Sequence, residues 1–76
     1  MTATTPIKGY REQTAEALNM VNENKVEEEH ILRNLDALRG EDEIEQRWLA
    51  IARTHFEQAY MALNRAIMRP ERIDLP

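Results

Sequence analysis

The sequence predicts an all-α protein: an antiparallel hairpin of two helices that assembles into a compact helical homo-oligomer. Between about Tyr10 and Arg39 the chain contains no proline or glycine, and residues that favour helix dominate. A second segment, which ends before Pro70, carries apolar residues at helical spacing. Gly40 separates the two segments, and so short a turn makes consecutive helices lie antiparallel.

Residues 1–9 are expected to form an N-terminal arm. A threonine–proline pair in this arm suits the cap and first position of a short helical turn. Gly9 interrupts that turn, so the chain can bend before Tyr10. The first helix is predicted to begin at about Tyr10 and to end at Gly40, because glycine commonly follows the last helical residue.

The apolar face of the first helix has a polar gap in its middle. Between Asn22 and His30 only Val26 is apolar, and Lys25 and Glu28 take positions where the face should be apolar. A solvated middle turn and a polar pocket cut into an interface explain this gap equally well. The apolar residues on either side of it are Leu18, Val21, Leu32 and Leu35.

The second helix is predicted to follow Asp42, which forms a variant of the capping box with Glu45. It must end at Arg69, because Pro70 cannot continue a helix and disfavours helical geometry in the residue before it. The predicted segments are an arm at residues 1–9, a hairpin at 10–69 with its turn near 40–42, and a tail at 70–76.

The second helix carries two apolar stripes, one bulky and one of alanines. A helix that buries two faces needs more than one neighbour. We expect the bulky stripe to pack on the first helix, with Val21 opposite Tyr60 and Asn24 near Glu57. The alanine stripe is then left to contact another copy of the chain. The bulky stripe comprises Leu49, Phe56, Tyr60, Leu63 and Ile67, and the alanine stripe comprises Ala52, Ala59, Ala62 and Ala66.

The composition argues against several functional classes. A formal net charge of −4 does not suit a protein that binds DNA or RNA polymers. No apolar run approaches the roughly 20 residues that span a bilayer, and the N-terminus lacks the apolar core of a signal peptide, so a soluble intracellular protein is expected. Serine and cysteine are both absent, which leaves no usual nucleophile, and no catalytic residue is predicted.

One motif has the spacing of a metal site. Glu27 and His30 form a Glu-x-x-His pair of the kind used by ferritin-like di-iron bundles. Such a site also needs a glutamate from a facing helix, and Glu57 is the one acid in the central part of the second helix. In a turn this rich in glutamate, coincidence is the better interpretation. We expect no metal and no cofactor, with a ferritin-like hairpin and a ligand-free oligomerisation module as alternative functions.

Two features suit a nucleotide ligand. Tyr10 follows a glycine at a predicted helix start, where an aromatic face is commonly exposed and a nucleobase can stack on it. Arg65 and Arg69 lie one turn apart at the end of a helix. They either interact with the helix dipole or form a guanidinium pair for a phosphate.

Three stretches of the sequence resemble the type 2 family of phage anti-CBASS sponges, which shares a helical-hairpin domain with one class of anti-Thoeris sponges. They are GYR at 9–11, VNENK at 21–25 and RWLAIARTHFEQAYMALNRAIMRP at 47–70. The resemblance implies a non-enzymatic homohexamer in the cytoplasm of the infected bacterial host. There it would sequester cyclic oligonucleotide messengers, such as 3′,3′-cyclic GMP–AMP, and so keep CBASS effectors inactive.

The resemblance also implies two kinds of pocket. In one, a tyrosine stacks on the base of a cyclic dinucleotide and a lysine pairs with its phosphates; these roles map to Tyr10 and Lys25, with Arg11 beside the tyrosine. In the other, on a threefold axis, an arginine from each chain binds a cyclic trinucleotide; Arg65 takes this role, with Arg69 second. Tyr10 and Lys25 would lie about 22 Å apart along a straight helix. One dinucleotide therefore reaches both only if the chain bends at Gly9 or two chains share the pocket.

Overall fold

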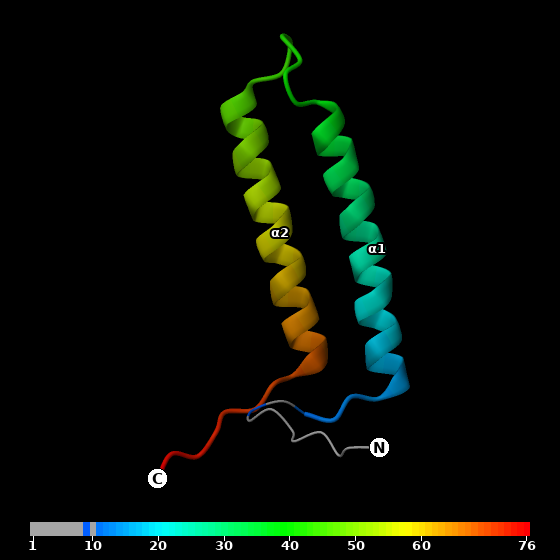
Figure 1. The fold of residues 1–76 in the computed structure, drawn as a ribbon, viewed down its shortest axis with the longest axis vertical. Coiled ribbons are helices and arrows are strands. Elements are labelled where there is room, and N and C mark those ends of the chain that lie inside the picture. Colours follow the sequence, from blue (N-terminus) through cyan, green and yellow to red (C-terminus); the bar gives the residue numbers. More distant parts are fainter. Residues whose placement is uncertain (1–8, 10) are drawn as a thin grey trace, which may run out of the picture.

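The computed structural model describes residue 9 and residues 11–76. Two helices, α1 (Ala15–Ala37) and α2 (Gln46–Met68), lie side by side and antiparallel, and a loop joins them at one end (Figure 1). Within the described residues these helices are the whole of the regular secondary structure. The predicted all-α hairpin is confirmed. Neither helix is long and apolar enough to cross a membrane.

Helix α1 begins later than predicted. Thr14 is its N-cap, in extended geometry with φ −75° and ψ 158°, and the threonine hydroxyl accepts a hydrogen bond from the Ala17 N–H at 3.0 Å. This bond satisfies one of the first N–H groups of the helix, which have no partner within it. Residues 11–13 therefore stay outside the helix, and the expected start near Tyr10 is wrong. The threonine–proline pair of the arm lies outside the described residues.

The loop between the helices is longer than the predicted turn at 40–42. Helix α1 ends at Ala37 with Leu38 as its cap, so Gly40 lies two residues after the cap rather than directly after the helix as predicted. Gly40 has a φ of +77°, a conformation that favours glycine. The side chain of Gln46 holds the loop: it accepts from the Gly40 N–H at 3.1 Å and donates to the Leu38 and Ile44 carbonyls, each also at 3.1 Å. These bonds hold the residues between Leu38 and Glu45 in a loop, and α2 starts only at Gln46.

The N-cap of α2 is Glu45 rather than Asp42. The Glu45 carboxylate accepts a hydrogen bond from the Trp48 N–H at 3.0 Å. The capping-box prediction placed Glu45 inside the helix, and that placement is wrong. At the other end, α2 stops at Met68 and Arg69 caps it, which confirms the expected end to within one residue.

The register of the two helices differs from the predicted one. Asn24 donates to the Asn64 side-chain carbonyl at 3.0 Å, so it lies about two turns of α2 away from the expected partner Glu57. Nearer the loop, Asp36 forms an ion pair with Arg53. A long loop leaves the helices free to slide, and this register gives these polar side chains partners across the interface.

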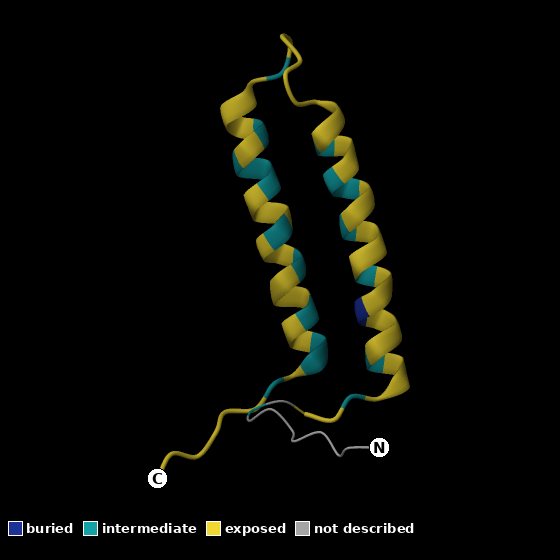
Figure 2. Cartoon of the chain, in the orientation of Figure 1, coloured by how far each residue is buried: buried dark blue, intermediate teal, exposed yellow. Residues whose placement is uncertain are grey.

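The interface between the helices is half polar. Val21, with 8% of its surface exposed, is the one buried hydrophobic side chain among the described residues. Asn24 and Glu28, from the polar gap of α1, are half-buried, whereas Lys25 is exposed (Figure 2). The gap is therefore neither uniformly solvated nor uniformly buried: part of it faces α2 and part faces outward.

The bulky stripe of α2 packs on α1 only in part. Leu49, Tyr60 and Ile67 are half-buried, but Phe56 and Leu63 remain 39% and 46% exposed. The reason is that Arg53, Glu57 and Asn64 take up part of the face that meets α1; all three are half-buried. Most of the alanine stripe is exposed, as expected, and Met61 beside it is 70% exposed. The hairpin thus carries a broad apolar surface on its outside.

The contact between Asn24 and Asn64 leads to a prediction for stability. Asn64→Leu leaves the half-buried Asn24 amide without its partner and should lower the free energy of unfolding by about 1 kcal/mol. Changing both residues to leucine should recover most of that loss, because a pair of apolar groups leaves nothing unsatisfied. Urea titrations followed by circular dichroism measure both effects. A double variant less stable than the single variant would contradict the assigned register.

Candidate functional site

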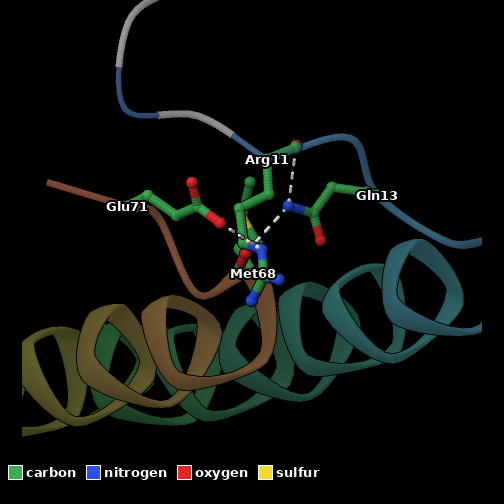
Figure 3. Close-up of polar contacts among 4 residues, drawn as sticks. All are labelled: Arg11, Gln13, Met68 and Glu71. Carbon is green, nitrogen blue, oxygen red and sulfur yellow. Dashed lines mark hydrogen bonds and ion pairs between the residues drawn. The ribbon is translucent and has the colours of Figure 1, made fainter. Parts of the chain in front are cut away.

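At the end of the hairpin opposite the loop, residues that precede α1 contact the end of α2 and the segment that follows it. The Glu71 N–H donates to the Gly9 carbonyl oxygen, and the Glu71 carboxylate lies 3.3 Å from Arg11 Nε. The Gln13 amide donates to the Met68 carbonyl at 2.8 Å and to the Arg11 carbonyl at 3.1 Å (Figure 3). We call this set of contacts the terminal clasp.

Local sequence explains why the clasp forms here. Arg69 adopts the left-handed conformation, with φ 49° and ψ 57°, and its N–H donates to the Arg65 carbonyl at 2.8 Å. Pro70 then turns the chain away from the helix axis. The last helical carbonyls have no donor within the helix, and Gln13 supplies one to Met68.

Gly9 is required at the clasp for two reasons. Its φ of +84° is unfavourable for any residue with a side chain. A Cβ atom built at this position would also lie 2.6 Å from the Glu71 carbonyl oxygen, which is too close for a real contact. The glycine is therefore needed for a close approach of two chain segments, a role beyond the bend that the sequence suggested.

Arg11 and Arg69 line the same cavity, although the sequence assigned them to different pockets. This cavity, of about 230 Å³, lies at the start of α1 and the end of α2. It is smaller than the roughly 300–1,000 Å³ of ordinary ligand pockets, so within one chain it offers room for only part of a nucleotide. The residues that line it are Arg11, Glu12, Gln13, Thr14, Ala17, Ile67, Met68 and Arg69.

Lys25 lies elsewhere, on the outer face of α1. It lines a shallow cavity of about 330 Å³ together with Val26, Glu29, His30 and Arg33. Arg33 forms an exposed ion pair with Glu29 at 3.8 Å, which adds little to stability at a solvated surface. The cavity therefore offers exposed cations for a phosphate, and none of the residues that line the Arg11 cavity belongs to it.

Arg65 lies on the outer face of α2. It lines the largest of these cavities, about 540 Å³, with mostly apolar neighbours that include Met61, Ala62 and Met68. Arg65 and Arg69 are one turn apart, as the sequence indicated, but they line different cavities. Tyr10, the expected stacking residue, lies outside the described residues, although its neighbours Gly9 and Arg11 both belong to the clasp.

The acidic residues of the polar gap meet a tyrosine rather than an acid of α2. Desolvation against α1 and the nearby carboxylates of Glu27 and Glu28 raise the pKa of the Tyr60 hydroxyl above its ordinary value. The raised pKa means that the folded protein favours the neutral phenol. The contribution of Tyr60 to the stability of the fold is therefore fully present below the ordinary tyrosine pKa, and it is lost as the pH rises through the pKa of Tyr60 in the folded protein. Within the part of the chain that the structure describes, no three His, Cys, Asp or Glu side chains are grouped as metal ligands would be.

Sequence reasoning missed Gln13 and Glu71 as parts of the open end. Gln13 stands within the predicted first helix, and Glu71 stands in the predicted tail; no role was assigned to either. The one available signal was the opposite charge of Arg11 and Glu71, which the hairpin brings to the same end.

Comparison with known proteins gives one family. The sequence model of a family described as "Acb2/Tad1, hairpin domain" matches residues 3–68, which is most of the chain. The match covers both helices and the loop and includes Arg11, Lys25 and Arg65, whereas Arg69 and Glu71 lie just beyond it. No curated protein matches the sequence.

Proposed function

Because the chain belongs to the Acb2/Tad1 hairpin-domain family, we propose that it is a phage sponge that sequesters cyclic oligonucleotide messengers of the host. It binds cyclic dinucleotides such as 3′,3′-cyclic GMP–AMP, and also cyclic trinucleotides, without cleaving them. In the cytoplasm of an infected bacterium this binding keeps the messengers from the CBASS effectors. The family match over residues 3–68 is the observation that carries the proposal.

The cavities supply the chemistry that such ligands need. Arg11, Lys25 and Arg65 each line an open cavity, so each proposed phosphate-binding cation is accessible from solvent. An arginine or lysine that binds phosphate makes charge-assisted hydrogen bonds, which are stronger than neutral ones. The apolar neighbours of Arg65 also leave room for the flat faces of nucleobases.

A homo-oligomer, which we take to be a hexamer, completes these partial sites. With a single buried hydrophobic residue among the described ones, one hairpin buries little apolar surface by itself. The exposed alanines of α2 and Met61 offer a face on which a second helix packs closely. Lys25 and Arg11 line different cavities of one chain, so a cyclic dinucleotide that binds both is held between two chains.

A thermal-shift panel tests the proposal. A ligand that binds only the folded state raises the melting temperature, by an amount that grows with concentration above its dissociation constant. The panel contains cyclic dinucleotides, cyclic trinucleotides and, as controls, the linear dinucleotides with the same bases. Stabilisation by a cyclic compound alone supports the sponge. No shift with any cyclic nucleotide at millimolar concentration would favour the oligomerisation module.

The bound ligand should be recovered chemically intact. After overnight incubation with 3′,3′-cyclic GMP–AMP the protein is denatured by heat, and the released nucleotide is analysed by liquid chromatography and mass spectrometry. We expect the cyclic compound alone, since the chain has neither serine nor cysteine to act as a nucleophile. Linear or hydrolysed nucleotide in amounts above a protein-free control would point to an enzyme instead.

A further inference from the structure

The segment after α2 contacts the arm through its main chain and a side chain at once. Glu71 donates its N–H to the Gly9 carbonyl oxygen, and its carboxylate pairs with Arg11 Nε at 3.3 Å (Figure 3 draws the ion pair). Gly9 and Arg11 are the two neighbours of Tyr10 in the sequence. Glu71, which lies outside the matched residues 3–68, thus contacts Gly9 and also Arg11, one of the residues proposed to bind the ligand.

The ion pair with Glu71 leaves Arg11 able to bind a phosphate. A guanidinium group has five N–H donors in a planar fork. When Nε is directed to Glu71, the two terminal nitrogens remain to make a bidentate contact of the kind that phosphates accept. The Arg11 side chain is 37% exposed, so these nitrogens can be reached from solvent.

The main-chain contact restricts Gly9 independently of charge. Gly9 approaches the Glu71 backbone so closely that a Cβ atom would lie 2.6 Å from the Glu71 carbonyl oxygen. The hydrogen bond between these residues fixes the Gly9 carbonyl group, two positions before Arg11 in the sequence. A contact group that is already held in place loses less conformational freedom on binding, and affinity rises accordingly.

We propose that Glu71 is a positioning residue of the cyclic dinucleotide site. Its carboxylate orients the Arg11 guanidinium, and its N–H anchors the chain at Gly9, so that Arg11 meets a ligand phosphate with little further ordering. This inference rests on the proposed function. It adds the C-terminal segment, outside the two helices, to the parts of the chain that determine affinity.

Two truncations separate Glu71 from the rest of the tail. A chain that ends at Pro70 lacks both contacts of Glu71, whereas a chain that ends at Arg72 keeps them and lacks only the last four residues. Calorimetry with 3′,3′-cyclic GMP–AMP should show binding at least about tenfold weaker for the first, which corresponds to about 1.4 kcal/mol, and an affinity close to that of the full chain for the second. Glu71→Ala and Gly9→Ala remove one contact each and should both weaken binding.

Two further measurements distinguish positioning from a structural role. Helix content and melting temperature should be the same in Glu71→Ala as in the full chain, because an exposed ion pair adds little to stability. Hydrogen exchange of the residue 71 amide, whose N–H donates to the Gly9 carbonyl oxygen, should become faster in that variant. Equal affinity of the two truncations would overturn the inference, as would tighter binding by Glu71→Ala, which would make Glu71 a competitor of the phosphate. A full-length protein that binds no cyclic dinucleotide would refute the proposed function and this inference with it.

Discussion

Alanine at Lys25 or at Tyr10 should weaken the binding of a cyclic dinucleotide by one to two orders of magnitude. Lys25→Ala removes a charge-assisted contact to phosphate, worth about 1.5–3 kcal/mol, and Tyr10→Ala removes base stacking of about 1–3 kcal/mol. Each 1.4 kcal/mol is a factor of about ten in affinity. Calorimetry on each single variant measures the loss. Lys25 is exposed, so its replacement should leave the melting temperature of the free protein unchanged.

Arg65→Ala should instead spare cyclic dinucleotides and abolish most binding of cyclic trinucleotides. On a threefold axis one substitution removes three charges from one ligand, so the loss should be steeper than in a pocket shared by two chains. Arg65 lines a cavity separate from those of Lys25 and Arg11, which is the structural basis for expecting separable effects.

The control for both experiments is Arg47→Ala, which removes an exposed cation from the first turn of α2, at the loop end of the hairpin. This variant should bind both ligand classes with unchanged affinity. If Lys25→Ala and Arg65→Ala weaken the same ligand equally, the two pockets are one, and a single shared site must replace them.

Ala62→Trp should break the assembly and leave the hairpin folded. Ala62 is exposed on the outer face of α2, so the hairpin itself has room for a large side chain. A close contact between helices of two chains has no such room, and overpacking there typically costs about 1–3 kcal/mol at each site. In the proposed symmetric oligomer this contact would recur, and the cost would be multiplied.

Light scattering after size-exclusion chromatography and circular dichroism together measure this effect. The expected variant is smaller than the wild-type particle and retains its helix content. Glu43→Trp, in the exposed loop, is the matched control and should assemble normally. A wild-type protein that is a folded monomer at micromolar concentration would contradict the oligomer itself, and an Ala62→Trp variant of unchanged size would place the contact on another face.

The contacts of the proposed binding residues could not be predicted from local pattern. The sequence identified Arg11 as a neighbour of the proposed stacking residue, but its partner Glu71 lies at the other end of the chain. Hydrogen bonds such as that between Gln13 and Met68 depend on where two helices end in space. Residue spacing along one helix carries no information about such contacts.

The sequence by itself determined the two helices, the hairpin and the family. A long run of helix-forming residues without proline or glycine favours a helix, and Gly40 and Pro70 act on the chain next to them, so the existence of these elements follows from local physics. Their first residues do not, because residues 11–13 and the loop before Gln46 also lack proline and hold helix formers yet lie outside the helices. Only the tertiary structure decided the register and the rotation of the helices. The hydrogen bond between Asn24 and Asn64 settles the register, and the half-polar interface leaves Phe56 and Lys25 on the outside. The physical reason is that a mixed face can pack in several ways of similar energy, and partners far apart in the sequence select one of them.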